Sequence, residues 1–254
     1  MNASSPLPLG PFDLHEVIGH GGMAEVWRGQ HRESGVPVAV KVLTGALGSS
    51  AFFERAFERE VQIVAGLDHP NIVMVLDYGV LGQQTAEHAQ DQLKAGSPYL
   101  VMELAQGGTL RHAMDQGLGN WHETRSILLS LLDALSHAHA RDIIHLDIKP
   151  ANVLWFNQNQ QPGWKLTDFG VSHATDHART ASVSMAMGTP AYMAPEQIEG
   201  QWRDYGPWTD LYGLGVMASA LVAGFVPLPG GPSVPLLVRL VFAPRPRLPS
   251  RFPP

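Results

Sequence analysis

The residues with the most explicit chemistry lie in one short segment near the middle of the chain, His145-Leu146-Asp147-Ile148-Lys149-Pro150-Ala151-Asn152. In this segment an acid is followed by a lysine two residues later and by an asparagine five residues later. From a single loop, such a set can converge on a hydroxyl group, a phosphate and a metal ion. Asp168-Phe169-Gly170 then supplies a second hard oxygen ligand of the kind that Mg²⁺ prefers. The two segments predict phosphate chemistry assisted by a metal.

A glycine-rich segment near the N-terminus, residues 18–26, points to the same chemistry. Glycines in a turn let backbone N–H groups approach phosphate oxygens. The pattern Gly19-x-Gly21-x-x-Ala24 also fits a dinucleotide-binding fingerprint, which requires a following helix and an acid about 20 residues on. Here the residues after Ala24 read as a strand, and Lys41 stands near the position of the expected acid. These observations favour a glycine hairpin over the dinucleotide site.

Lys41 closes an apolar strand-like run, and a glutamate further along the chain is its expected partner. Residues 51–67 predict a helix that places Phe53, Phe57, Glu60 and Val64 on one face. A glutamate among apolar neighbours is costly unless a cation meets it. We therefore expect an ion pair between Lys41 and Glu60 that presents the lysine ammonium to ATP phosphates.

The elements that position these residues change in character along the chain. In the first hundred residues, short β-branched runs at 12–19, 24–30, 36–43, 71–79 and 97–104 predict an antiparallel sheet. The polar, Gln/Ala-rich segment at 81–97 predicts a solvated loop insertion. The second half is predicted to be helical, and residues 121–140 place Ile127, Leu131 and Leu135 on one core-facing stripe, with Leu128 and Leu132 beside it.

Composition limits the class of protein further. The chain has 254 residues, 44% of them hydrophobic, a net charge of -6 and no cysteine. It should form a substantial core, and it lacks the basic stripe of a nucleic-acid binder. Residues 211–238 carry no charge and are long enough to raise the question of a membrane helix. Because Gly224 and Pro227 interrupt the run, a buried helix of a domain is favoured.

In this order, the four chemical elements resemble the signature set of protein kinases: a glycine loop, a V-A-I-K strand, an H-R-D-x-x-x-x-N loop and D-F-G. The resemblance continues at residues 188–196, which are similar to the G-T-x-x-Y-M-A-P-E segment of serine/threonine kinases, and at residues 208–215. It spans about residues 12–224 and is strongest to the bacterial eukaryotic-like (Hanks-type) kinases. The implied fold is α+β and bilobal, with an antiparallel-sheet small lobe and a mainly helical large lobe.

The resemblance implies domain limits and a set of site residues. An extension at 1–11 precedes a small lobe at 12–104, an abbreviated large lobe at 105–242 and a proline-rich tail at 243–254. Catalysis is assigned to Asp147, Lys149, Lys41 and Glu60, metal binding to Asn152 and Asp168, and the substrate and activation segment to Thr189 and Glu196. ATP binding is assigned to Ile18, Gly19, His20, Gly21, Gly22, Met23, Ala24, Glu25, Val26, Ala39, Lys41, Met102, Glu103 and Ala105. Candidate phosphorylation sites are Thr175, Thr180, Ser182 and Ser184.

By the same resemblance, Lys149 indicates transfer from ATP to serine or threonine rather than tyrosine. The implied cofactors are ATP and Mg²⁺, with Mn²⁺ as an alternative metal. The implied partners are protein substrates and a second copy for autophosphorylation, with no nucleic acid. The expected location is the cytoplasm, with any membrane anchor in a region outside this chain. The competing hypothesis is a pseudokinase that binds nucleotide or serves as a scaffold.

Two departures from the family pattern bear on regulation. Leu146 replaces the arginine that usually precedes the catalytic aspartate and helps to bind a phosphorylated activation loop. We therefore expect activation to depend only weakly on loop phosphorylation. The proline-rich end also lacks an obvious arginine partner for Glu196, although Arg239, Arg245 and Arg247 are candidates.

Overall fold

The computed structural model describes residues 6–21, 24–44, 61–62, 64–89, 93–118, 120–157, 162–169 and 190–224. The chain divides into two compact units. The first comprises Met1–Asp68, Val73–Ala105 and His173–Ala178, and the second comprises His69–Ile72, Gln106–Ser172 and Arg179–Pro254.

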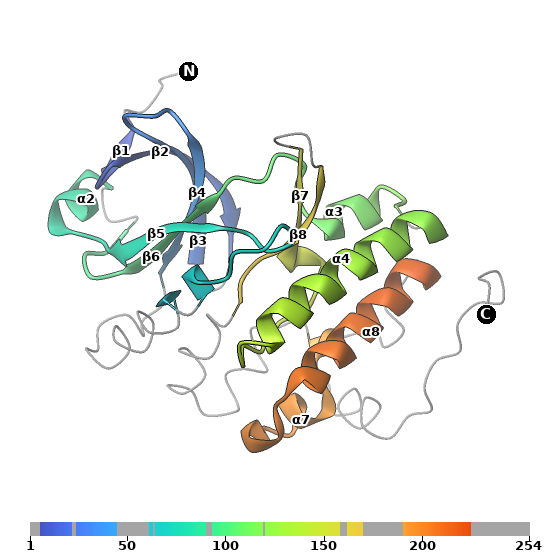
Figure 1. Cartoon of the computed structure of the whole chain (residues 1–254). Helices are drawn as coiled ribbons and strands as arrows, with labels where there is room; N and C mark the ends of the chain where they lie inside the picture. Colours follow the sequence, from blue (N-terminus) through green and yellow to red (C-terminus); the bar gives the residue numbers. More distant parts are fainter. Residues whose placement is uncertain are drawn as a thin grey trace. The chain divides into compact units, whose positions relative to one another are not determined.

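The first unit is built on a six-stranded antiparallel sheet (Figure 1). Its strands are β1 (Leu7–Leu9), β2 (Phe12–His20), β3 (Ala24–His31), β4 (Pro37–Leu43), β5 (Val75–Val80) and β6 (Pro98–Glu103). They are hydrogen-bonded in the order β1-β2-β3-β4-β6-β5. The antiparallel sheet expected for the first hundred residues is therefore confirmed.

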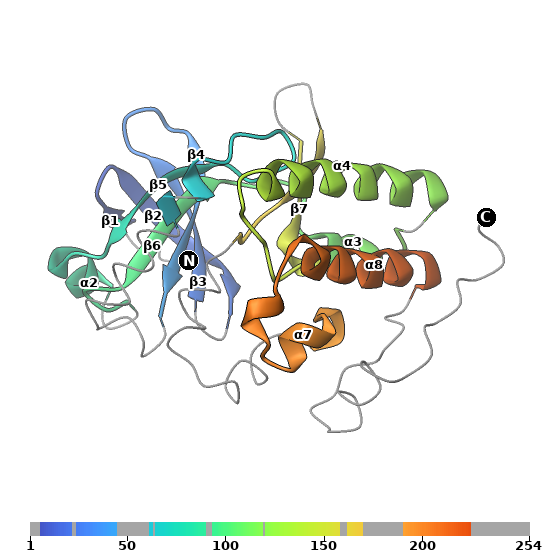
Figure 2. The same cartoon turned by 60° about the horizontal axis from the view of Figure 1, so that its bottom comes forward.

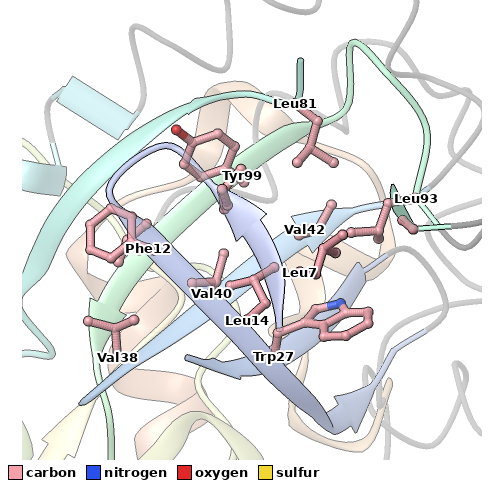
Figure 3. Packing of buried hydrophobic residues seen from close by; sticks show 13 residues of the cluster. Leu7, Phe12, Leu14, Trp27, Val38, Val40, Val42, Leu81, Leu93 and Tyr99 are labelled. Carbon is pink, nitrogen blue, oxygen red and sulfur yellow. The ribbon is translucent and has the colours of Figure 1, made fainter. Parts of the chain in front are cut away.

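The side chains on one face of β4 form the centre of this unit's core. Val38, Val40 and Val42 lie on one face of the strand and are at most 1% exposed, because successive residues of a strand point to opposite faces. They belong to one buried cluster with Leu14 of β2 and Trp27 of β3 (Figure 3). Burying a valine side chain stabilises a fold by roughly 1.5–3 kcal/mol, so β4 is held firmly in the sheet.

The polar insertion at 81–97 is not the solvated loop that its composition predicted. It contains α2 (Gln83–His88), and Leu81 and Leu93 on either side of this helix are each 2% exposed. The Thr85 hydroxyl donates a hydrogen bond to the carbonyl oxygen of Pro8 at 2.9 Å, which ties α2 to β1. The prediction failed because a few apolar residues, widely spaced in a polar segment, are enough to anchor a short helix against a sheet.

The second unit is mainly helical (Figure 2). It contains α3 (Leu110–Asp115), α4 (Trp121–His139), α7 (Pro195–Ile198) and α8 (Pro207–Ala223), with the two-stranded hairpin of β7 (Val153–Phe156) and β8 (Gly163–Leu166). Short 3₁₀ helices cover Pro150–Asn152, Pro190–Tyr192 and Trp202–Asp204. The hairpin directs the chain from the end of the motif at residues 145–152 to Asp168.

Helix α4 is amphipathic and its main stripe is buried as predicted, but the prediction that Leu132 lies beside that stripe on the core side is wrong. Its start is fixed by Asn120, whose Oδ1 accepts a hydrogen bond from the Glu123 amide at 2.9 Å. Ile127, Leu131 and Leu135 are each 1% exposed and face the core. Leu129 lies on the opposite side and is 49% exposed, and Leu132, at the flank of the stripe, is 41% exposed because the flank faces solvent.

Helix α8 lies beside α4 in both views (Figures 1 and 2). It begins at Pro207, which suits the first helical turn because proline has no amide hydrogen to lose. It ends before Gly224, whose φ of 78° is left-handed and favours glycine. No helix in the described part of the chain is both long enough and apolar enough to cross a membrane.

Candidate active site

The glycine segment forms the end of the β2–β3 hairpin. Gly19 pairs with Val26 and His20 pairs with Glu25. The Gly21 amide donates to the Ala24 carbonyl at 2.8 Å and closes the turn. Because a strand and not a helix follows the glycines, the dinucleotide interpretation is excluded. The predicted positions Ile18 to Gly21 and Ala24 to Val26 belong to this hairpin, whereas Gly22 and Met23 lie outside the described residues.

Lys41 lies on β4, opposite Val26 of β3 and Leu100 of β6, and its side chain is partly buried. Two residues earlier on the same strand, Ala39 pairs with Met102. The hairpin, Lys41 and Ala39 therefore belong to one continuous sheet. Glu60 lies outside the described residues, so its ion pair with Lys41 stays a prediction.

The predicted adenine-binding segment follows the end of β6. Glu103 is its last strand residue, and its amide donates to the carbonyl of Met74 at 3.1 Å. The Glu103 carboxylate in turn accepts from the Met74 amide at 2.9 Å. These two hydrogen bonds between Met74 and Glu103 fix the backbone just before Leu104 and Ala105.

The catalytic motif of the second unit brings three predicted side chains together around one carboxylate oxygen. Asp147 Oδ2 accepts hydrogen bonds from Lys149 Nζ at 2.7 Å and from Asn152 Nδ2 at 2.9 Å. Asn152 Nδ2 also donates to the Asp147 carbonyl at 2.8 Å. Asp147 Oδ1 has no hydrogen-bond partner among the described residues. The carboxylate is therefore oriented by one oxygen and can accept a proton or a hydroxyl hydrogen bond through the other.

His145 supports this loop from within the core and is completely buried. Its Nδ1 accepts from the Asp147 amide at 3.2 Å, and its Nε2 lies 2.8 Å from the Thr167 carbonyl oxygen. Since an amide can only donate, Nδ1 is the acceptor and Nε2 carries the hydrogen. The imidazole therefore links the catalytic loop to the residue that precedes Asp168, and the ring packs against Phe169 with centroids 4.5 Å apart.

Asp210 at the start of α8 is the second support of the loop, and it is 1% exposed. Its two carboxylate oxygens accept from the amides of His145 at 2.8 Å and Leu146 at 2.7 Å. Oδ2 also lies 2.7 Å from Nε2 of His139 on α4. A buried carboxylate is stable only when donors surround it. Here those donors come from both the loop and α4.

These bonds hold Leu146 in an unusual backbone conformation. Its φ is 64°, in the left-handed region that non-glycine residues rarely adopt. Such a conformation costs on the order of 1–3 kcal/mol and persists where the surroundings over-determine it. Further along the loop, Ile148 packs closely on α8, since a Cβ at Gly213 would lie 3.1 Å from its side chain.

Asn152 and Asp168 form the predicted metal-binding pair. Asn152 is 5% exposed, and its amide nitrogen is occupied by Asp147, which leaves Oδ1 as the oxygen available to a cation. The Thr167 amide donates to the Asn152 carbonyl at 2.9 Å and so brings the adjoining Asp168 near it. Two hard oxygens fit a divalent cation that takes its other ligands from phosphates and water. Among the described residues, no group of three or more His, Asp or Glu side chains could hold a metal by itself.

Glu196 is anchored by a residue that the sequence did not suggest. Its Oε1 accepts a hydrogen bond from the Thr209 hydroxyl at 2.6 Å, and that hydroxyl accepts from the Gly206 amide at 3.1 Å. The candidate arginines 239, 245 and 247 lie outside the described residues. So do Thr175, Thr180, Ser182, Ser184 and Thr189, and their assignments stay predictions.

Two further side chains matter at this end of the unit. Gln197 of α7 donates to the Leu146 carbonyl, a contact that no sequence pattern indicated. Burial raises the pKa of the Tyr192 phenol, with Arg111 opposing the shift, so Tyr192 stays neutral.

The sequence did contain a signal for the role of Asp210. Asp210 is the last charged residue before a long uncharged run, and a lone acid at that place needs hydrogen-bond donors.

A separate pocket of about 640 Å³ lies between the N-terminal half of α4 and the β7–β8 hairpin. Trp155, Trp164 and Ile127 line it, whereas Asp147 and Asn152 do not. This pocket is therefore separate from the polar cluster at Asp147. We identify the candidate active site from the hydrogen bonds of that cluster.

The antiparallel sheet with its glycine hairpin and lysine, and the helical unit with its Asp-Lys-Asn cluster, together define a protein kinase domain. Residues 12–235 match the protein kinase domain family, and the chain belongs to that family. A family of this kind uses ATP and a divalent metal.

The chain is also similar to several bacterial serine/threonine-protein kinases. The chain is 35% identical over 246 residues to the serine/threonine-protein kinase PknA of Mycobacterium tuberculosis, covering 96% of this chain and 54% of the relative. It is 34% identical over 259 residues to the serine/threonine-protein kinase PkaA of Streptomyces coelicolor, covering 97% of this chain and 45% of the relative. The chain therefore spans about half the length of these curated relatives, and its sequence is similar to bacterial Hanks-type serine/threonine kinases.

A solved structure is similar in fold as well. The crystal structure of the PknI kinase domain of Mycobacterium tuberculosis, a double mutant, has a TM-score of 0.68 to this chain at 27% identity. The match covers 90% of this chain and 79% of that one. The bilobal α+β kinase-like fold that the motifs implied is confirmed.

Proposed function

We propose that this domain transfers the γ-phosphate of ATP to serine or threonine hydroxyls of proteins, with Mg²⁺ held by Asn152 and Asp168. The observation that carries the proposal is the cluster at Asp147, in which Lys149 and Asn152 orient the carboxylate through Oδ2 and leave Oδ1 for a substrate hydroxyl. A bound cation would neutralise negative charge on the phosphate oxygens.

In the proposed reaction, the acceptor hydroxyl oxygen forms a bond to the γ-phosphorus, and the bond from that phosphorus to the bridging oxygen breaks. ADP leaves, and the hydroxyl proton passes to the Asp147 carboxylate. Lys149 lies beside Asp147, and its ammonium can stabilise the transferred phosphoryl group. The protein contributes mainly positioning and electrostatic stabilisation.

The test is incubation with Mg²⁺ and γ-labelled ATP, with a generic protein substrate and with the chain itself, for the wild type and for Asp147→Asn. Asparagine keeps the size of aspartate but cannot accept the proton, so we expect label transfer to fall by about 10²–10⁴-fold. Phosphoamino-acid analysis should find phosphoserine or phosphothreonine, and a parallel series with Mn²⁺ tests the alternative metal. Equal incorporation by both proteins would reject the catalytic function, and retained ATP binding would then support the pseudokinase alternative.

Label found in the chain itself is the measurement for autophosphorylation. Mixing the wild type with an epitope-tagged Asp147→Asn variant distinguishes transfer between copies from transfer within one copy. We propose transfer between copies, so the tagged variant should become labelled; its staying unlabelled would contradict this. We further propose that the reaction takes place in the cytoplasm, where ATP is supplied, and cell fractionation tests that location.

A further inference from the structure

The peptide that joins Leu146 to Asp147 is held at both of its polar atoms. Its N–H, which belongs to Asp147, donates to His145 Nδ1 at 3.2 Å. Its carbonyl oxygen, which belongs to Leu146, accepts from Gln197 Nε2 at 2.8 Å. Because a peptide unit is planar, fixing both atoms fixes the plane from which the Asp147 side chain projects.

The orientation of the Gln197 amide is determined by its own contacts. Its Oε1 accepts from the Ala194 amide at 3.0 Å, at the start of α7. An exchanged orientation would place the NH₂ group against that N–H and the amide oxygen against the Leu146 carbonyl, both of which are repulsive. Nε2 therefore faces Leu146, and Gln197 links α7 to the catalytic loop through two complementary bonds.

Leu146 needs such a link because its own side chain offers no hydrogen bond or charge. It occupies a left-handed conformation with a φ of 64°, held on its N–H side by Asp210 Oδ1 at 2.7 Å. On its carbonyl side the contact is Gln197. Gln197, an uncharged residue, therefore connects α7 to the loop that carries Asp147. In the chain, α7 follows the candidate phosphorylation sites.

We propose that Gln197 is a positioning residue for phosphoryl transfer: its amide anchors the 146–147 peptide and so holds Asp147 in its working orientation without a phosphorylated side chain. This inference rests on the proposed kinase function for its catalytic consequence. It requires a donor at position 197, so a residue of equal shape that cannot donate should fail.

The decisive variant is Gln197→Glu, which keeps the shape and the acceptor for Ala194 but turns an anionic oxygen toward the Leu146 carbonyl. The matched control is Gln201→Glu, the same change at an exposed glutamine of the same segment. We expect kcat of Gln197→Glu to fall by about 10- to 100-fold, as for a misplaced catalytic group. The KM for ATP should stay within about twofold, since Asp147 is expected to meet the acceptor hydroxyl and not the nucleotide. Gln201→Glu should match the wild type in both.

Hydrogen exchange gives a readout independent of activity. The peptide spanning residues 143–152 should exchange at least about threefold faster in Gln197→Glu than in Gln201→Glu, because release of the anchor lets the Leu146 and Asp147 amides open. Unchanged exchange would reject the anchor, and faster exchange with an unchanged kcat would reject its positioning role. If the wild type transfers no phosphate, the proposed function fails, while the exchange experiment still decides whether Gln197 holds the loop.

Discussion

Asp210 is a single residue on which several contacts of the site depend. One buried carboxylate accepts from two successive loop amides and from the His139 imidazole. In an Asp210→Asn variant, the side-chain amide would replace one acceptor oxygen with a donor, and that donor would face an N–H group and leave it without its acceptor. The structural role of Asp210 is therefore to satisfy buried donors rather than to react.

We predict that Asp210→Asn lowers the free energy of unfolding by about 3–5 kcal/mol, the cost of breaking a buried charged network. Asp133→Asn is the matched control, because Asp133 also pairs with a histidine, His69 at 3.2 Å, but its side chain is 68% exposed. The control should change stability by less than about 0.5 kcal/mol. Denaturant unfolding of both variants measures the difference, and similar losses would contradict the central role of Asp210.

At the scale of elements, α4 shows how one helix separates core from surface. Leu131 and Leu129 are the same residue type two positions apart, yet one is 1% and the other 49% exposed. The buried face packs inside the second unit, and the helix is fixed at its C-terminal end by the contact between His139 and Asp210. The position of α4 therefore affects the catalytic loop through Asp210.

We expect Leu131→Ala to destabilise the protein by about 2–5 kcal/mol, because it removes buried methyl groups and leaves a cavity. Leu129→Ala should cost less than about 0.5 kcal/mol, since its side chain is already half in water. Thermal and denaturant unfolding measured side by side test the assignment of the two faces. Equal effects would mean that the helix is rotated relative to this structure.

At the scale of the whole molecule, nucleotide binding should stabilise the folded chain. A ligand that binds only the folded state at 100 times its Kd adds about 2.7 kcal/mol. For a chain of this size each kcal/mol shifts Tm by roughly 2–4 °C. Saturating Mg-ATP should therefore raise the wild-type Tm by about 5–10 °C.

Lys41→Met should lose most of this shift, because methionine cannot bind the phosphates that Lys41 is expected to meet. Lys94→Met, at an exposed lysine of the same unit, should keep it. An equal shift in both variants would show that nucleotide binding does not depend on Lys41. This measurement needs no phosphoryl transfer and therefore applies equally to an active kinase and to a pseudokinase.

Much of the fold was accessible from local patterns. The hydrophobic period of β4 and α4, and the turn glycines of the β2–β3 hairpin, each depend on residues close in sequence, so they could be predicted. The insertion at 81–97 could not, because α2 is held by long-range contacts such as that between Thr85 and Pro8. A polar segment carries no local sign of the surface on which it will pack.

The same division applies to the candidate site. The family and the expected chemistry could be predicted from the order and spacing of Lys41, Asp147, Lys149, Asn152 and Asp168. This is possible because each position of such a motif requires a particular chemical type of residue. Only the tertiary structure revealed that Asp147 is oriented through Oδ2, that Asp210 and Gln197 pin the loop, and that Thr209 anchors Glu196. The last three of these contacts join residues 13 to 64 positions apart. Contacts across such separations are made by folding, and a residue's type alone does not reveal them.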